Sequence, residues 1–383
     1  MTAKIVLGFL FLSLAGALLY YRGMTGTGRI SEEPGLSATV SPSPLEEIND
    51  GNESVRVVAG NLDTPWAIAF LPDSGILVTE RPGRVRLVNS EGVLENEPVA
   101  VLESVKEIGE GGLLGLALHP EFSENNYVYF YYTYEGSGNN TFNRVVRMHF
   151  RDGKLTDEEI IVDGIPGASN HNGGRIKFGP DGNLYIGTGD AQEPSGAQDT
   201  SVYAGKILRV TPEGKPTAGN PFNNHVYSYG HRNVQGLSWD SNGQLWATEH
   251  GRSGISSGLD EVNLIIAGKN YGWPEIQGDE SRQGMYAPVR HSGVSNTWAP
   301  AGAAFINDSL YFGGLRGQTL YEAVTAENRI VEFKEHFRGR YGRIREVIKG
   351  PDSNLYITTS NQDGRGNPEG DDDRIILINP SLL

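Results

Sequence analysis

The chain has 383 residues, enough for one large domain or two smaller ones with a substantial core. Its 32 basic and 47 acidic residues give a net charge of −15, which argues against nucleic acid as a partner. There are 51 glycines and few long segments with a helical period, so the composition favours an all-β fold. Cysteine is absent, which excludes disulfides and thiolate metal sites.

Residues 1–22 are predicted to be a targeting segment. After Lys4, an uncharged run from Ile5 to Tyr21 is rich in Leu, Phe and Ala. Its length is at the lower limit for a membrane-spanning helix and slightly beyond the usual apolar core of a signal peptide. No small-x-small cleavage site follows it, which favours a helical membrane anchor over a cleaved signal peptide. Either segment predicts an extracytoplasmic protein whose contact with a membrane is made through this segment only.

Residues 23–53 are predicted to be a flexible linker. They are rich in Gly, Ser, Thr, Pro and Glu, with only scattered apolar residues, and such a composition buries too little apolar surface to fold. We therefore expect the folded domain to occupy residues 54–383.

A hairpin pattern recurs along this domain. In its clearest copy, apolar and polar residues alternate over 175–178 and 183–186, on either side of the turn Gly179-Pro180-Asp181-Gly182. Proline fixes φ and glycine accepts a positive φ, so such a turn joins two antiparallel strands. Similar pairs of apolar runs surround residues 72, 120, 241, 307 and 351. Irregular repeats with room for about four short strands each predict a six-bladed β-propeller.

The two ends of this domain are expected to close the ring. Val55 to Ala59 and Arg374 to Leu377 read as strands without a hairpin partner of their own, and pairing them in one blade would remove two free edges. A parallel β-helix is the structural alternative, although its coils would be shorter and more regular. Two stacked sandwiches are a further alternative, which would not explain the similar hairpins.

Propellers place their ligands where loops from several blades converge, and five loops here combine glycines with unusual polar residues. Glycine lets a backbone approach a ligand closely. Four arginines in these loops, aimed at one axis, would repel one another in the absence of an anion. The loops are Gly109–Gly115, Asn170–Gly174, Tyr229–Gly236, Gly313–Arg316 and Tyr341–Arg345.

The order of these motifs resembles the soluble glucose/sorbosone dehydrogenase family. The similarity covers roughly Val55 to the end of the chain and rests on GGLLGLALHPEF, HNGGRIKFGPDGNLYIGTGD, YGHRNVQGLSW, EHG with DEVNLI and GKNYGWP, and GRIREV. That family comprises quinoprotein aldose sugar dehydrogenases, six-bladed propellers that use pyrroloquinoline quinone (PQQ) and calcium. The resemblance implies oxidation of aldose sugars at C1 to lactones by hydride transfer to PQQ. The electrons would then pass to an external acceptor, a quinone or a redox protein.

Roles for individual residues follow from the same resemblance. His171 resembles the general base that takes the proton of the C1 hydroxyl, and Arg232 is expected near the reacting carbonyl. The residues expected to bind the cofactor are Glu110, Asn233, Arg316, Arg343 and Arg345. Arginine suits this task because its planar guanidinium binds carboxylates through two hydrogen bonds.

Three of these positions depart from the family pattern. Arg316 stands where a lysine is usual, which keeps the charge and changes the geometry. Glu110 replaces a glutamine that lies near the sugar in better-known relatives, and Asn170 replaces an aspartate. The last two changes leave the preferred sugar open.

Two calcium sites are implied as well. The calcium of the cofactor would take backbone oxygens of Gly251 and Arg252, and Glu261 and Tyr271 resemble ligands of a structural calcium. Calcium prefers hard oxygen ligands of this kind, and a bound cation can polarise a carbonyl as a Lewis acid.

Two other function classes stay open on the residues alone. A calcium-dependent lactonase or other hydrolase would need Asp, Asn and Glu side chains on the axis, and fold alone does not decide between activities. A non-enzymatic extracellular propeller that binds a partner would have no reason to keep a histidine beside inward-facing arginines. His119 and His231 are predicted to be structural residues.

Overall fold

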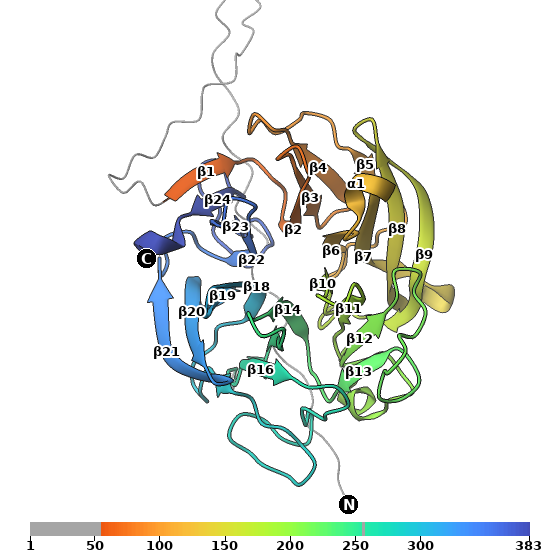
Figure 1. The fold of residues 1–383 in the computed structure, drawn as a ribbon, viewed down its shortest axis with the longest axis vertical. Coiled ribbons are helices and arrows are strands. Elements are labelled where there is room, and N and C mark those ends of the chain that lie inside the picture. The colour runs from red at the N-terminus through yellow and green to blue at the C-terminus, as the bar shows by residue number, and fades with distance from the viewer. Residues whose placement is uncertain (1–54, 255–256) are drawn as a thin grey trace, which may run out of the picture. The chain divides into compact units, whose positions relative to one another are not determined.

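The computed structural model describes residues 55–254 and 257–383. Within this part of the chain, six antiparallel four-stranded sheets lie around a common centre (Figure 1). The predicted six-bladed β-propeller is thus confirmed, and the β-helix and two-sandwich alternatives are wrong. The predicted N-terminal helix and the linker lie outside the described residues and stay predictions. No helix among the described residues is long and apolar enough to cross a membrane.

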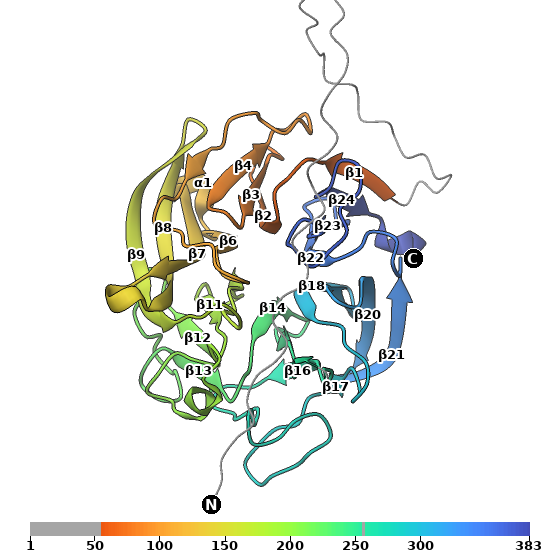
Figure 2. The same ribbon diagram turned by 180° about the vertical axis from the view of Figure 1, so that it is seen from behind.

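Five blades consist of four consecutive strands, and the first strand of each blade lies nearest the centre (Figures 1 and 2). Blade one holds β2 (Pro65–Phe70), β3 (Ile76–Glu80), β4 (Arg84–Val88) and β5 (Ala100–Val101). Blade two holds β6 (Leu113–Leu118), β7 (Tyr127–Glu135), β8 (Thr141–Arg151) and β9 (Lys154–Pro166). Blade three holds β10 (Ile176–Phe178), β11 (Leu184–Gly187), β12 (Lys206–Val210) and β13 (Val226–Tyr229). Blade four holds β14 (Val234–Trp239), β15 (Leu245–Glu249), β16 (Glu261–Ile265) and β17 (Arg290–His291), and blade five holds β18 (Pro300–Ile306), β19 (Ser309–Gly314), β20 (Thr319–Ala326) and β21 (Arg329–His336).

The sixth blade closes the ring with strands from both ends of the domain. It consists of β22 (Ile344–Lys349), β23 (Leu355–Thr359), β24 (Ile375–Ile378) and β1 (Val55–Ala59). In the β1–β24 pair, Val55 lies opposite Ile378 and Val57 opposite Ile376. The predicted closure is confirmed, with β24 one residue later than expected. The helices named among the described residues are short, namely α1 (Phe122–Asn125) and 3-10 turns at Ser137–Asn139, Pro194–Gln198 and Pro380–Leu382.

The recurring turns join the first and second strands of the blades. In blade three, Phe178 pairs with Leu184, and the Asp181 carboxylate accepts the backbone N–H of Asn183 at 3.2 Å and the hydroxyl of Tyr185 at 3.2 Å. Gly182 has a φ of 72°, which glycine adopts at little cost. These aspartates and glycines therefore build the turns.

Antiparallel pairing decides which loops meet. The loop that enters the first strand of a blade and the loop that joins its second and third strands both leave the same end of the sheet. We call this end of the propeller the loop end. Glu110 precedes β6, His171 precedes β10, and Arg316 follows β19. Residues that are far apart in sequence therefore converge at the loop end, and the hairpin turns lie at the other.

The centre of the ring contains charged side chains that pair with each other. Arg175, next to β10, forms a buried ion pair with Glu346 of β22. Lys177 donates to the carbonyls of Leu237 at 3.1 Å and Ala303 at 3.0 Å, and burial lowers its pKa to about 8. Because these contacts join blade three to blades four, five and six, they hold the first strands in register around the axis.

We expect the closing blade to contribute strongly to stability. Replacing Ile376, which is buried, by alanine should lower the free energy of unfolding by about 2–5 kcal/mol, as for other large core truncations. Val331→Ala on the exposed side of β21 should change it by less than about 0.5 kcal/mol. Urea denaturation of both variants tests this, and equal losses would contradict a closing role for β24.

Candidate active site

A cavity of about 450 Å³ lies at the loop end, and we call it the mouth cavity. Seven of the eleven residues expected to have a catalytic, cofactor-binding or metal-binding role line it: Glu110, His171, Gly251, Arg252, Arg316, Arg343 and Arg345. Another hollow, of about 550 Å³, is lined by residues such as Leu71 and Phe150 at the hairpin-turn end and contains none of them. The mouth cavity is therefore the candidate site.

His171 stands on the wall of this cavity and is held at three points. Its Nδ1 lies 2.7 Å from Asp190 Oδ1, its Nε2 lies 2.8 Å from Nη2 of Arg232, and its backbone N–H donates to Glu110 Oε2 at 3.2 Å. Because the carboxylate and the guanidinium fix the two ring nitrogens, Nδ1 carries the proton and Nε2 is the acceptor. The side chain is 16% exposed, so His171 is more enclosed than a glycine-rich loop suggests.

Asp190 is a residue that sequence reasoning missed. It follows β11 and is fully buried, and its carboxylate also accepts the backbone N–H of Gln192 at 2.9 Å and the indole N–H of Trp273 at 2.9 Å. These bonds hold the carboxylate against His171, where it orients the imidazole. The available signal was its position at the end of the motif GTGD, in a loop at the loop end.

Arg232 and Asn233 lie behind the histidine. Arg232 donates from Nη2 to Ser253 Oγ at 2.8 Å as well as to His171. Burial lowers the pKa of its guanidinium, while Asp190 and Glu110 act in the opposite direction. Asn233 Oδ1 accepts the backbone N–H of Gly173 at 2.9 Å, and its Nδ2 is buried without a partner among the described residues. Neither residue lines the mouth cavity, but both shape the wall that carries His171.

His231 is structural, as predicted. It is fully buried, with Nδ1 2.7 Å from Glu249 Oε2 and Nε2 2.8 Å from Ser228 Oγ. Its ring stacks on Tyr271 with 4.7 Å between centroids. Both nitrogens are used and the side chain does not line the mouth cavity, whereas His171 and His250 do.

The arginines of the cavity differ in how their charge is compensated. Arg343 donates to Asp363 Oδ2 from Nε at 2.9 Å and from Nη2 at 2.6 Å. Arg345 is buried and donates to Gln235 Oε1 at 2.5 Å, and burial lowers its pKa to about 9. Its Nε has no hydrogen-bond partner in the part of the chain that the structure describes. The exposed Arg316 donates to Ser257 Oγ at 3.0 Å.

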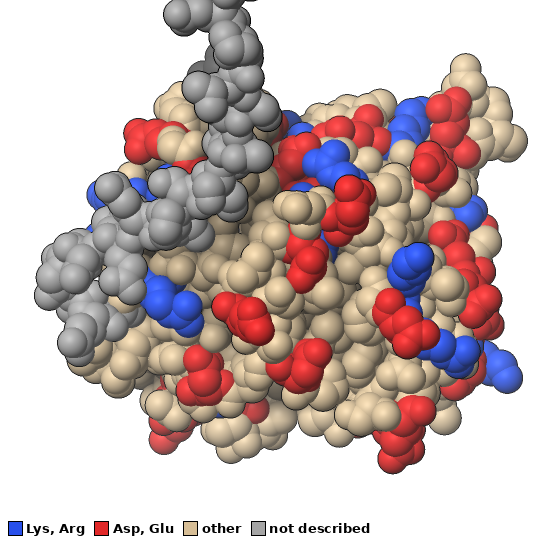
Figure 3. Space-filling view, turned by 90° about the horizontal axis from the view of Figure 1, so that it is seen from above, with Lys and Arg blue, Asp and Glu red and all other residues tan. Residues whose placement is uncertain are grey.

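Among the described residues, neither Arg316 nor Arg345 has a carboxylate partner. On the outer face seen in Figure 3, by contrast, side chains of both signs are interspersed. The cavity therefore offers cationic groups that an anionic ligand can neutralise.

Gly251 and Arg252 form a fixed turn on the cavity wall. The backbone N–H of Gly251 donates to Asp260 Oδ1 at 2.9 Å, and a side chain at Gly251 would meet the carbonyl of Leu259 at 2.3 Å. The carbonyl of Arg252 accepts the N–H of Gly258 at 3.3 Å. The turn is thus held in place by Asp260, with backbone oxygens available at a cavity lined by cations.

Glu261 and Tyr271 line a small cavity of about 10 Å³ beneath this wall, next to Arg232. Burial and the neighbouring Glu249 raise the pKa of Glu261 to about 8. Gln277 Oε1 is buried there without a partner among the described residues. The phenol of Tyr271 donates to the carbonyl of Leu264 at 2.6 Å and accepts the N–H of Ile266 at 2.9 Å, so it is not a free ligand.

The donors around this small cavity fit a single bound cation. A positive ion there would offset the buried carboxylate and give the unpartnered amide oxygen a ligand. Within residues 55–254 and 257–383, no three His, Asp or Glu side chains are grouped as a metal site. A cation would therefore depend on amide and backbone oxygens as well as on Glu261.

We expect Arg345 to lower the free energy of unfolding of the ligand-free protein. Arg345→Met removes a buried charge without a carboxylate partner and should leave the free energy of unfolding unchanged or raise it by up to about 2 kcal/mol. The matched control is Arg175→Met, which should lower it by about 3–5 kcal/mol because Glu346 is left buried and unpaired. Denaturant unfolding of the ligand-free variants measures both free energies of unfolding. A large decrease in Arg345→Met would show that the charge of Arg345 is already compensated within the protein.

Comparison with known proteins places this geometry in a family. The family described as Glucose / Sorbosone dehydrogenase matches residues 62–376. A putative oxidoreductase (glucose dehydrogenase) of Thermus thermophilus is 46% identical with a TM-score of 0.80, covering 85% of this chain and 99% of that one. The PQQ-bound aldose sugar dehydrogenase of Streptomyces coelicolor is 39% identical with a TM-score of 0.79, covering 85% and 98%. The aldose sugar dehydrogenase YliI of Escherichia coli is 31% identical over 342 residues, 81% of this chain and 91% of that protein. The chain therefore belongs to the glucose/sorbosone dehydrogenase family.

Proposed function

We propose that this protein oxidises aldose sugars at C1 to lactones, with PQQ and calcium as cofactors, and passes the electrons to an external quinone or redox protein. Relatives named sugar dehydrogenases, one of them with PQQ bound, support this proposal. The observation that carries it is His171, held between Asp190 and Arg232 on the wall of an arginine-lined cavity. The apolar run from Ile5 to Tyr21 would place the propeller outside the cytoplasm, anchored or secreted.

The residues of the mouth cavity fit PQQ. Its three carboxylates need several cationic partners, and Arg316 and Arg345 lack carboxylate partners among the described residues. Arg345 Nε is a buried donor, on a residue of the cavity wall, that a ligand could satisfy. Arg343 would contribute as well, with its guanidinium oriented by Asp363. When bound, PQQ supplies the two-electron acceptor of the reaction.

His171 would remove the proton of the C1 hydroxyl through Nε2. That atom accepts a hydrogen bond from Arg232 at 2.8 Å, so a sugar hydroxyl must share this contact or replace it. The released guanidinium would then stabilise negative charge as it develops beside the histidine. Asp190 holds Nδ1 and offsets the positive charge that His171 acquires.

Calcium is proposed at two places. The backbone oxygens of the turn at Gly251 and Arg252 would bind the ion that accompanies the cofactor. Glu261 and the unpartnered amide oxygen of Gln277 would bind a structural ion, together with a backbone carbonyl if Tyr271 takes part.

The alternatives find less support at the site. A calcium-dependent lactonase needs carboxylate and amide side chains grouped around a metal on the axis, whereas no three His, Asp or Glu side chains of the described residues are grouped in this way and five arginines line the mouth cavity. A non-enzymatic binding propeller would gain nothing from a histidine held in one tautomer by a buried carboxylate.

The direct test follows visible absorption of the protein mixed with PQQ and Ca²⁺, before and after glucose is added. The proposal requires a change on binding and a second change, from oxidised to reduced cofactor, on addition of sugar. His171→Gln should still bind PQQ but lose about 10²- to 10⁴-fold in kcat, the usual contribution of a general base.

Asp190→Asn serves as a companion variant, because it keeps a side chain of the same size beside Nδ1 and removes its charge. We expect a large loss in kcat with an unchanged PQQ dissociation constant. If His171→Gln turns over within threefold of wild type at saturating PQQ, the base lies elsewhere.

The structural calcium can be tested apart from turnover. Calcium should raise the Tm of the chelator-treated protein, because a ligand that binds only the folded state stabilises it. Glu261→Gln should abolish most of this shift by removing the charged ligand. Glu275→Gln, at an exposed ion pair with Arg282, provides the control and should retain it. If calcium raises the Tm of Glu261→Gln as much as that of wild type, Glu261 is not a ligand of the ion.

A further inference from the structure

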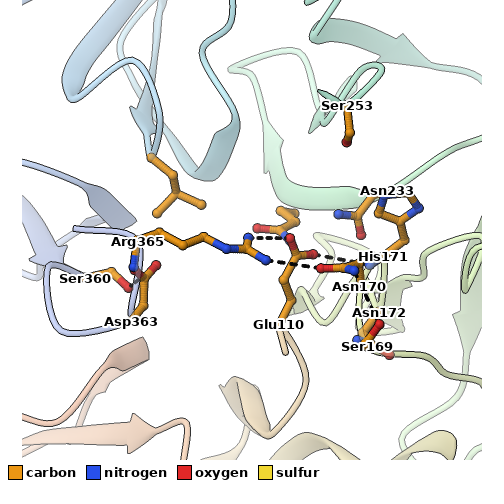
Figure 4. Close-up of polar contacts among 12 residues, drawn as sticks. Glu110, Ser169, Asn170, His171, Asn172, Asn233, Ser253, Ser360, Asp363 and Arg365 are labelled. Atoms are coloured by element: carbon orange, nitrogen blue, oxygen red, sulfur yellow. Dashed lines mark hydrogen bonds and ion pairs between the residues drawn. The ribbon is translucent and has the colours of Figure 1, made fainter. Parts of the chain in front are cut away.

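Arg365 reaches across the loop end to the residues that carry the base, although sequence reasoning gave it no role. It lies after β23 and lines the mouth cavity. Its Nη1 donates to Glu110 Oε1 at 2.6 Å and its Nη2 to Asn170 Oδ1 at 3.1 Å. The other carboxylate oxygen of Glu110 accepts the backbone N–H of His171 (Figure 4). A guanidinium from blade six is thus fixed beside the loop that presents the base.

The backbone below Arg365 is held by a buried ion pair. Asp363 Oδ1 accepts the N–H of Arg365 at 2.9 Å, and Asp363 Oδ2 accepts two hydrogen bonds from Arg343. Gly366 packs so closely that a side chain there would meet the carbonyl of Asn361 at 2.5 Å. The backbone that carries Arg365 is therefore fixed, which limits the entropy lost when the Arg365 side chain binds a ligand.

The ion pair with Glu110 persists over the working pH range. Burial opposes ionisation of Glu110, whereas Arg365 and the backbone N–H of His171 favour the carboxylate and hold its pKa below the ordinary value; His250 adds to this only when it is charged, and burial lowers the pKa of His250 to about 4. A guanidinium has five N–H groups, and only part of them serve Glu110 and Asn170. The Arg365 side chain is 51% exposed at the cavity, so its other N–H groups are accessible there.

We propose that Arg365 is a substrate-contacting residue that donates hydrogen bonds to hydroxyl groups of the aldose and thereby helps to set sugar preference. This inference rests on the proposed function. A sugar whose C1 hydroxyl reaches His171 brings its neighbouring hydroxyls to the same wall. Glu110 and Asn170 bind Arg365 and keep oxygen lone pairs that can accept hydrogen bonds from these hydroxyls, whereas Arg365 only donates.

Steady-state kinetics of the holoenzyme, loaded with PQQ and Ca²⁺, test this assignment. Arg365→Gln should raise KM for glucose about tenfold or more, the effect of losing a hydrogen bond to a charged group, with kcat within about threefold of wild type. The KM of Arg365→Lys should lie between those of wild type and Arg365→Gln, because an ammonium keeps the charge but does not reproduce the paired N–H groups of a guanidinium. The PQQ dissociation constant should stay within about twofold.

Deoxy sugars show whether the contact is direct. Removing the hydroxyl that Arg365 binds, among the 2-deoxy, 3-deoxy and 4-deoxy forms of glucose, should weaken wild type and leave Arg365→Gln almost unaffected. Arg338→Gln is the matched control, because Arg338 is 66% exposed, pairs with Glu335 at 3.4 Å and does not line the mouth cavity. It should behave as wild type with every sugar.

Three outcomes would overturn the assignment. One is an unchanged KM in both Arg365 variants. Another is a fall in kcat at constant KM, which would mean that Arg365 acts through His171. The third is an equal effect of the variants on every deoxy sugar. If wild-type holoenzyme oxidises no aldose, the proposed function fails and this inference with it; if wild type is active and the variants match it, only this inference fails.

Discussion

Buried positive charge without a carboxylate partner is the constraint that shapes the loop end of this propeller. Arg345 is buried against a neutral amide, and Arg232 donates to an imidazole and a hydroxyl. Taking a guanidinium out of water costs free energy that such neutral partners offset only in part. In a chain with a net charge of −15, carboxylates for these positions are plentiful. A ligand that brings its own negative charge is the simplest account of why none is there.

The centre of the same ring shows that the fold can neutralise a buried arginine where no ligand is needed. Arg175 pairs with Glu346 there, and both are buried. Arg345 and Glu346 are neighbours on β22, where the register with β23 shifts between Ile344 and Glu346. Glu346 supplies a carboxylate to the packed centre, and Arg345 lines the mouth cavity. Stability and binding thus use adjacent positions of one strand.

The sequence was sufficient to predict the blades, because turn chemistry and alternation are local signals. The turn at Asp181 and the β1–β24 pair were both predictable in this way. The arginines were predictable as a group because they stand in glycine-rich loops. Asp190 and Arg365 were missed because each acts through a partner from a distant loop: Asp190 lies 19 residues from His171, and Arg365 lies 255 residues from Glu110. Both follow the second strand of their blade, so a search of those loops for charged residues would have found them.

Ring closure and site geometry depend on the same few residues. Asp373, just before β24, exchanges backbone hydrogen bonds with Leu62 at 3.0 Å in each direction, which ties the closing blade to the segment that leads from β1 to β2. Its carboxylate also accepts the N–H of Asn361 at 2.5 Å, at the start of the loop that carries Asp363 and Arg365. Closing the ring therefore fixes the backbone from which Arg343 is oriented and Arg365 reaches Glu110. The strand contributed by the amino end of the domain thus acts on the site indirectly, because it completes the blade that holds this loop.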